Sequence, residues 1–180
     1  VFTAFGRTGT FFAKDVFENQ PDFVCMSKGL TSGMLALGAT ATTAEIFNEF
    51  TGGESRKFYH GHTFTANALA CAVALQSLKI FDRDDVVEKN QTLQSVLAEQ
   101  VGRFAPLPNV GDVRHLGMIW AAELVRDKST RELFSPANAL GWEIAKRAWE
   151  KGIWLRPMGS ALYVIPPYCS SVEDLRLCFD

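Results

Sequence analysis

Short apolar runs, each bounded by glycine or proline, alternate with polar residues over the first fifty positions of the chain. The runs are FFAKDVF at residues 11–17, DFVCMS at residues 22–27 and MLALGATATT at residues 34–43. This pattern is typical of strands in a buried sheet. The residues from Val1 onwards have the pattern of the end of a further strand. The sequence therefore predicts that the chain opens with strands of a buried sheet.

Helical patterns dominate the middle of the chain. Thr43 is a favoured N-cap residue and predicts a short helix over residues 44–50, followed by an exposed loop, TGGESRK. Residues 66–82 are rich in alanine and leucine and almost free of charge, which predicts a helix buried on most of its surface. Residues 84–103 carry apolar side chains at helical spacing among polar ones and predict an amphipathic helix.

The last seventy residues mix helix and strand patterns. Residues 136–151 predict a helix, because Pro136 stands near its start and Gly152 just past its end. A final helix of about two turns is expected after Ser171, an N-cap residue followed by acidic side chains. Strand patterns are found at GDVRHLG, MIWAAELV, IWLRP and ALYVIPP, the last two joined by the turn MGS. This order predicts an α/β domain followed by a smaller α+β domain.

Composition and charge narrow the classes of function. The formal net charge of the 180 residues is −2 with no basic cluster, which argues against a nucleic-acid partner. No apolar run approaches the roughly 20 residues that cross a bilayer, and the first residues lack a signal-peptide pattern. We therefore expect a cytoplasmic protein without a membrane partner. Reduced, buried thiols rather than zinc ligands are expected at Cys25, Cys71, Cys169 and Cys178.

Lys28 stands in the segment CMSKGLTSG, after an apolar run and before a turn punctuated by glycine. A lysine at the carboxyl end of a buried strand lies where α/β folds place ligands. Desolvation favours the neutral amine, which is the form that attacks carbonyl groups. The residues alone leave two interpretations open: a reactive amine, or a solvated lysine on the surface.

A second segment with candidate chemistry is HGHTFTAN, residues 60–67, ahead of a helix that we expect to start near Asn67. The Thr63 hydroxyl and the backbone N–H groups before that helix would form a cradle for an anion. The alternative is that Thr63 only caps the helix or closes a turn. His60 and His62 have no third metal ligand near them in the sequence, so we expect no metal site.

Arg156 lies in LRPMGSALYVIPPY, within an apolar run that has strand character. An unpaired guanidinium is costly to bury, so Arg156 either pairs internally, for example with Glu123, or binds an anion. Its planar fork suits a carboxylate bidentately. Tyr163 follows on the same run, and a bend at Gly159 would be needed to bring both side chains to one site.

Three segments, FGRTGTFFA, PDFVCMSKGLTSGMLALGA and YHGHTFTANALACAVALQSL, resemble in order and spacing the class III aminotransferases, which use pyridoxal 5'-phosphate. The resemblance runs through essentially all 180 residues. It implies an α/β, fold-type-I PLP-dependent transferase, with residues 1–82 in the large cofactor-binding domain and residues 83–180 in a small C-terminal domain. It also implies that Lys28 is the catalytic residue, which holds the cofactor as an imine and then acts as a general base.

The same resemblance implies roles for the other candidate residues. Thr63, with His62 beside it, would bind the cofactor phosphate of the other subunit in a homodimer. Gly61 would offer backbone contacts to the substrate. Arg156 would bind the substrate carboxylate, and Tyr163 would line the substrate site.

Two branches of the class fit the last segment differently. Tyr163 and Tyr168 match the branch that transfers an amino group from S-adenosylmethionine to 8-amino-7-oxononanoate, which gives 7,8-diaminononanoate in biotin biosynthesis. The alternative is an ω-amino acid:pyruvate aminotransferase, which more often has a non-aromatic residue at the first position and leucine at the second. Both branches act on small molecules, and we favour the first.

Other interpretations depend on what surrounds this chain. The family has an aspartate that pairs with the pyridinium nitrogen just before FGRTG, and the resemblance places it ahead of Val1. We therefore expect the complete enzyme to be longer and this piece alone to bind the cofactor weakly. A non-catalytic interaction module, or a racemase or aminomutase of the same class, are the remaining alternatives.

Overall fold

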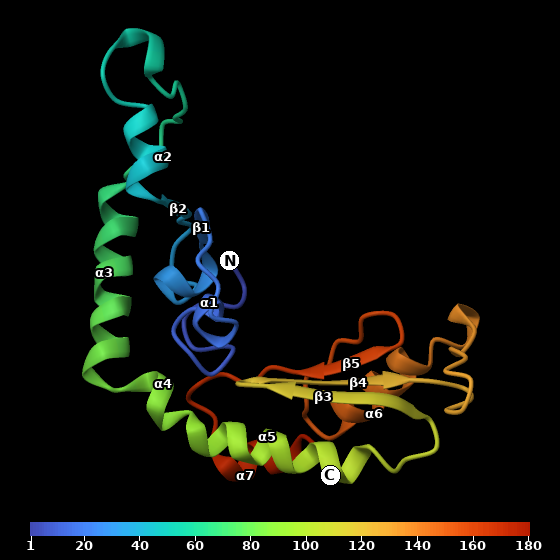
Figure 1. The fold of residues 1–180 in the computed structure, drawn as a ribbon. Helices are drawn as coiled ribbons and strands as arrows, with labels where there is room; N and C mark the ends of the chain where they lie inside the picture. The colour runs from blue at the N-terminus through green and yellow to red at the C-terminus, as the bar shows by residue number, and fades with distance from the viewer. The chain divides into compact units, whose positions relative to one another are not determined.

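The structure, a computed structural model, describes residues 1–180 and divides them into two compact units, residues 1–87 and residues 88–180 (Figure 1). The division falls within the short helix α4 (Val86–Lys89). No helix in either unit combines the length and the apolar character that a membrane crossing requires.

Unit 1, residues 1–87, combines a two-stranded antiparallel hairpin with one long helix. In the hairpin, Phe23 lies opposite Thr42 and Met26 opposite Ala39. Its elements in chain order are α1 (Ala13–Val16), β1 (Phe23–Met26), the 3-10 turn η1 (Lys28–Thr31), β2 (Ala39–Thr42), α2 (Ala44–Glu49), the 3-10 turn η2 (Glu54–Arg56) and α3 (Ala68–Arg83).

The core of unit 1 is built on Phe5, which is only 2% exposed. Its ring meets Phe11 edge to face, with centroids 5.4 Å apart, and Phe81 of α3 at 6.2 Å. Leu30 of η1 and Ala74 of α3 complete the buried cluster. Helix α3 therefore lies alongside the N-terminal coil, as Figure 1 shows in green and blue.

The strand prediction for the first fifty residues is confirmed only at β1 and β2. Residues 11–17 form the helix α1 and its flanking turns, because the first two phenylalanines of this run turn into the Phe5 cluster. The residues from Val1 form turns, not a strand. The hairpin is also not buried, since Phe23 is 56% exposed. A short apolar run cannot distinguish a strand from another buried segment by its periodicity.

The helix predictions in unit 1 hold better. Thr43 caps α2, accepting a hydrogen bond from the backbone N–H of Ile46 at 3.4 Å, and the loop TGGESRK is exposed as expected. Helix α3 confirms the helix predicted over residues 66–82, but its predicted burial is wrong, because Leu69 and Leu75 are 74% and 61% exposed. Its buried residues are all small: Ala70, Ala74 and Ser77.

Unit 2, residues 88–180, is a three-stranded antiparallel sheet in the order β3-β4-β5, packed against helices. The strands predicted at GDVRHLG and MIWAAELV are confirmed, and so is the amphipathic helix, which is divided into α4 and α5. The elements in chain order are α5 (Gln91–Phe104), β3 (Val110–Leu116), β4 (Ile119–Leu124), the 3-10 turn η3 (Pro136–Asn138), α6 (Leu140–Glu150), β5 (Ala161–Val164) and α7 (Val172–Leu177).

The core of unit 2 centres on Trp120 of β4, whose ring meets Phe104 of α5 and Phe179 at 5.0 Å each. Leu97 of α5 and Met118 are fully buried beside it. Burying side chains of this size contributes about 1.5–3 kcal/mol each to folding. The apolar face of α5 therefore holds this helix against the sheet and α7.

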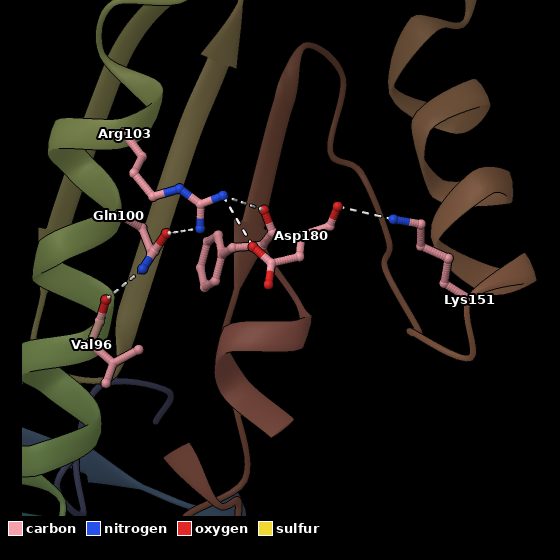
Figure 2. A network of polar contacts seen from close by, with 6 residues as sticks. Val96, Gln100, Arg103, Lys151 and Asp180 are labelled. Carbon is pink, nitrogen blue, oxygen red and sulfur yellow. Dashed lines mark hydrogen bonds and ion pairs between the residues drawn. The ribbon is translucent and has the colours of Figure 1, made fainter. Parts of the chain in front are cut away.

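A polar network ties α5 to the last residues and to the end of α6 (Figure 2). Arg103 donates to the Asp180 carboxylate at 3.1 Å, to the Phe179 carbonyl at 3.4 Å and to the Gln100 side chain at 3.0 Å. Lys151 donates to the Asp180 carbonyl at 2.9 Å. Each exposed ion pair contributes at most about 1 kcal/mol, so the network orients these segments more than it stabilises them.

Two further expectations concern the start of α7 and the four cysteine thiols. Ser171 is the N-cap of α7 as predicted and forms a capping box with Asp174. The cysteines are free, but the prediction that they are buried is wrong, because two of them lie on the exposed face of the hairpin and in a surface loop. Cys25 and Cys169 are exposed, and Cys71 and Cys178 are partly exposed.

Candidate active site

Lys28 begins η1, a single 3-10 turn that follows β1 after one residue. Its φ is +46°, and Ser32 at the end of the turn has a φ of +50°. Non-glycine residues in this left-handed region cost of order 1–3 kcal/mol each and persist only where their surroundings hold them. The turn that carries Lys28 is therefore strained at both ends.

Several contacts hold this turn. A Cβ atom at Gly29 would lie 2.7 Å from a ring carbon of Phe5, so only glycine allows the turn to approach the core so closely. The hydroxyl of Thr31, which is 1% exposed, donates to the Leu35 carbonyl at 2.5 Å. The hydroxyls of Ser32 and Ser77 lie 2.7 Å apart and tie the turn to α3. Core packing and hydrogen bonds together fix the backbone at Lys28.

The side chain of Lys28 is exposed, and its Nζ lies 5.2 Å from the centre of the Phe2 ring. Lys28 follows the carboxyl end of β1 as expected, but the expected burial of that strand is wrong, because the β1–β2 hairpin is largely exposed within these residues. A cation–π contact of this kind contributes about 0.5–1 kcal/mol at an exposed site. The Lys28 amine is thus accessible to a carbonyl compound while its backbone is held.

The loop of residues 60–66 is exposed and folds into a turn ahead of α3. Thr65 closes the turn, since its hydroxyl accepts from the His62 N–H at 3.0 Å. Asn67 caps α3, since its side chain accepts from the Ala70 N–H at 3.0 Å. The capping and turn roles considered for Thr63 belong to these two residues instead. The Thr63 hydroxyl makes no hydrogen bond within the 180 residues, and an anion could accept one from it.

The histidines in this loop have local roles. His60 stacks on Phe58, with ring centroids 5.5 Å apart, and the His62 Nδ1 accepts from the Phe64 N–H at 3.1 Å. Neither belongs to a group of three or more ligand-type side chains that could hold a metal ion. Gly61 lies between them and is exposed, so its backbone is accessible.

Arg156 is exposed and lies in unit 2, in a coil between α6 and β5. The predicted strand IWLRP is wrong, because β5 begins only at Ala161. The flanking residues are held on both sides: the Trp149 indole N–H donates to the Leu155 carbonyl at 3.0 Å, and Pro157 packs against Gly141. This segment is therefore fixed by packing rather than by pairing in a sheet.

The internal salt bridge considered for Arg156 is not formed. Glu123 instead accepts from Arg114 at 3.2 Å, and hydrogen bonds with Asp112 and Glu123 raise the pKa of the Arg114 guanidinium. No ion pair in the 180 residues involves Arg156. Its guanidinium is available to an external anion.

Tyr163 lies on β5, opposite Ala121 of β4, and is partly exposed. The chain bends between Arg156 and Tyr163 as expected. Met158 and Ala161 exchange two backbone hydrogen bonds, and Gly159 between them has a φ of +60°. The two residues are not on one strand, however, because β5 starts after the bend.

Unit 1 carries the two kinds of group that bind an aldehyde with a phosphate, an amine at Lys28 and, in a separate loop, a hydroxyl donor at Thr63. Lys28 supplies an accessible primary amine on a held backbone. The Thr63 hydroxyl supplies a donor with no internal partner, ahead of a 16-residue helix whose N-terminus favours anions. The sequence pattern identified both residues, but it missed Ser77 and Phe5, which hold the Lys28 turn through contacts distant in sequence.

Comparison with known proteins places this chain in a family. The family model of the class III aminotransferases matches residues 1–180. The chain is 43% identical over 182 residues to the adenosylmethionine-8-amino-7-oxononanoate aminotransferase of Aquifex aeolicus, a match that covers 100% of this chain and 40% of that protein.

Two solved structures have the same fold. The crystal structure of adenosylmethionine-8-amino-7-oxononanoate aminotransferase from Methanocaldococcus jannaschii aligns with a TM-score of 0.91 at 40% identity, over 98% of this chain and 42% of that one. A thermostable (S)-enantioselective omega-transaminase from Thermomicrobium roseum aligns with a TM-score of 0.92 at 34% identity, over 99% and 40%.

The chain belongs to the class III aminotransferase family. This family consists of pyridoxal-phosphate-dependent enzymes, and the prediction of an α/β, fold-type-I transferase is confirmed. Three relatives that are 41% to 43% identical to the chain over the aligned residues bear the name adenosylmethionine-8-amino-7-oxononanoate aminotransferase. The chain spans about 40% of the length of these relatives.

Proposed function

We propose that this chain is part of an aminotransferase that moves an amino group from S-adenosylmethionine to 8-amino-7-oxononanoate, which gives 7,8-diaminononanoate in biotin biosynthesis. The observation that carries the proposal is the accessible Lys28 amine on a turn held by core contacts. The substrates are supported by the 43% identity to a relative named for this reaction.

Pyridoxal 5'-phosphate, when bound, supplies an aldehyde that accepts amines and a ring that accepts electrons. The Lys28 Nζ would bind the cofactor covalently and then take and return the proton at the substrate carbon that bears nitrogen. The Thr63 hydroxyl would donate to a phosphate oxygen, with His62 beside it. Gly61 leaves the backbone open to the substrate at this loop.

Arg156 and Tyr163 would bind the substrate. The acceptor, 8-amino-7-oxononanoate, carries a carboxylate, and Arg156 has a guanidinium fork without an internal ion pair. Tyr163 offers a partly exposed ring and a hydroxyl on β5. An aromatic side chain of this kind suits a substrate with both an apolar chain and polar groups.

The assembly and location are part of the same proposal. We assign residues 1–82 to the large cofactor-binding domain and residues 83–180 to the small C-terminal domain. The enzyme would be a cytoplasmic homodimer whose active site is shared across the interface. Exposed apolar side chains near the Thr63 loop, Phe64 and Leu69 among them, support an interface there.

An ω-amino acid:pyruvate aminotransferase is the second candidate. The likeness to the Thermomicrobium roseum omega-transaminase, at a TM-score of 0.92 and 34% identity, supports it. A non-catalytic interaction module is the alternative from another class, and the retained amine, hydroxyl and guanidinium at Lys28, Thr63 and Arg156 argue against it.

The test uses the complete protein that contains these residues, loaded with pyridoxal phosphate. S-adenosylmethionine with 8-amino-7-oxononanoate is compared with an ω-amino acid and pyruvate, with the products identified by mass spectrometry. We expect 7,8-diaminononanoate, and borohydride reduction should label the peptide that carries Lys28. Faster transfer to pyruvate would favour the second candidate. No transfer and no label at Lys28 would favour the interaction module.

A further inference from the structure

Ser77 lies on the face of α3 that is turned to the core, and it is 5% exposed. The other buried residues on this helix, Ala70 and Ala74, carry no polar side-chain atom. Ser77 thus places the one hydroxyl on an otherwise apolar buried face. A buried hydroxyl is costly unless it forms a hydrogen bond, so its partner is informative.

The partner is the hydroxyl of Ser32, at 2.7 Å and 45 residues earlier in the chain. Ser32 ends η1 in the left-handed conformation, with its N–H bonded to the Gly29 carbonyl at 3.1 Å. The next N–H, that of Gly33, donates to the carbonyl of Lys28 itself at 3.2 Å. The buried hydroxyl of α3 therefore holds Ser32, and the backbone N–H groups of Ser32 and of the next residue bond back into the turn, the second of them to Lys28.

This connection acts on a turn that is strained at both ends, at Lys28 and at Ser32. A turn of this kind relaxes when the contacts that hold it are removed. Relaxation would move the origin of the Lys28 side chain and therefore its amine. We propose that Ser77 is a positioning residue for Lys28, acting through its hydrogen bond with Ser32. This inference rests on the proposed function, in which the Lys28 amine binds the cofactor.

The experiment measures attack by the Lys28 amine rather than turnover. The complete protein is freed of cofactor, mixed with pyridoxal phosphate, and quenched with borohydride at timed intervals. Peptide mapping then gives the rate of labelling at Lys28, with Lys57 and Lys79 as internal references. The variants are Ser77→Ala, Ser32→Ala, their double variant, and Ser77→Thr, which keeps the hydroxyl.

Ser77→Ala and Ser32→Ala should each slow labelling at Lys28 by about tenfold, between the effect of one lost hydrogen bond and that of a displaced reacting group. The double variant should be slower than either single variant by no more than about twofold, because both remove the same bond. Ser77→Thr should restore the rate. The rates at Lys57 and Lys79 should not change.

Ala70→Gly is the matched control, because it weakens α3 at a buried position whose side chain has no hydrogen-bonding group. It should lower stability in urea while leaving the Lys28 rate within about twofold of wild type. An unchanged rate in both serine variants, or an equal fall in Ala70→Gly, would overturn the proposal. Wild-type protein without preferential labelling at Lys28 would overturn the proposed function as well, so the two failures are distinguishable.

Discussion

The two units differ in how much of their apolar surface they bury. Unit 2 has nine buried residues in one cluster around Trp120, drawn from its helices and its sheet. Unit 1 has four buried residues around Phe5, although it is of similar length. Its exposed side chains include large apolar ones: Phe58, Tyr59, Phe64, Leu69 and Leu75 are 61% to 76% exposed.

This difference is informative because the candidate catalytic and cofactor residues, Lys28 and Thr63, both lie in unit 1. Large apolar side chains that are exposed in such number are typical of a surface that another chain segment or protein covers. Unit 2 can form its core from its own residues, whereas unit 1 leaves much apolar surface open. We infer that the region with the reactive amine depends on further chain or on another subunit, and each prediction below tests that comparison.

The largest effect is expected at Lys28. Lys28→Arg keeps the positive charge but removes the primary amine, so it should lower amino transfer by about 10²–10⁴-fold. The measurement is the single-turnover rate of the complete protein with S-adenosylmethionine. Lys79→Arg, on the exposed face of α3, is the control and should leave the rate unchanged. A single-turnover rate of Lys28→Arg within tenfold of the wild-type rate would contradict the assignment of the reactive amine to Lys28 in unit 1.

A pair of leucines on the long helices of the two units compares their burial directly. Leu97 of α5 is 0% exposed, so Leu97→Ala should lower the free energy of unfolding of the 180-residue chain by about 2–5 kcal/mol. Leu75 of α3 is 61% exposed, and Leu75→Ala should change it by about 0.5 kcal/mol or less. Urea unfolding followed by circular dichroism measures both.

The same pair sharpens the comparison in the complete protein. If further chain or a second subunit covers α3, the cost of Leu75→Ala should rise toward that of Leu97→Ala. An equally small effect of Leu75→Ala in the complete protein would mean that the apolar surface of unit 1 stays open. The inference from the two cores would then be wrong.

The sequence predicted the elements of unit 2 better than those of unit 1, because unit 2 buries more of its own apolar side chains. In β4 burial alternates from residue to residue along Ile119–Leu124, because one face of the sheet is covered. In unit 1, runs such as FFAKDVF contribute to an aromatic cluster around Phe5, which has no periodicity. Helix α3 has the composition of a buried helix, and its exposed leucines are what a fragment of a larger fold would show.

The candidate residues could be found from the sequence, but what holds them could not. Lys28 and Thr63 stand in segments whose order resembles a known family. The bond between Ser32 and Ser77 spans 45 residues, and no local pattern indicates it. The apolar run around Arg156 predicts a strand, but the segment is a coil held by packing of Pro157 on Gly141 rather than by sheet pairing.

The third prediction is that substitutions in unit 2 affect substrate binding, whereas substitutions in unit 1 affect cofactor binding. Arg156→Met in unit 2 should raise KM for 8-amino-7-oxononanoate by about 10–100-fold, the value of a lost hydrogen-bonded charge pair. It should leave cofactor affinity unchanged. Thr63→Val in unit 1 should weaken cofactor affinity by about tenfold or less, because it removes one hydroxyl donor. Steady-state kinetics gives KM, and cofactor titration gives the cofactor affinity. If Thr63→Val raised KM and Arg156→Met did not, the assignment of substrate binding to unit 2 would be wrong.

The smallest expected effect compares the helix caps of the two units. Ser171 accepts from the Asp174 N–H at 3.0 Å and caps α7, whose Leu175 is 1% exposed in the core of unit 2. Ser171→Ala should therefore lower the free energy of unfolding by about 1 kcal/mol. Thr43 makes a longer bond, 3.4 Å, to a helix with no buried residue, so fraying of α2 costs little. Thr43→Ala should lower the free energy of unfolding of the 180-residue chain by less than about 0.5 kcal/mol. Urea unfolding measures both variants. An equal effect at both caps would show that α2 is as firmly packed as α7.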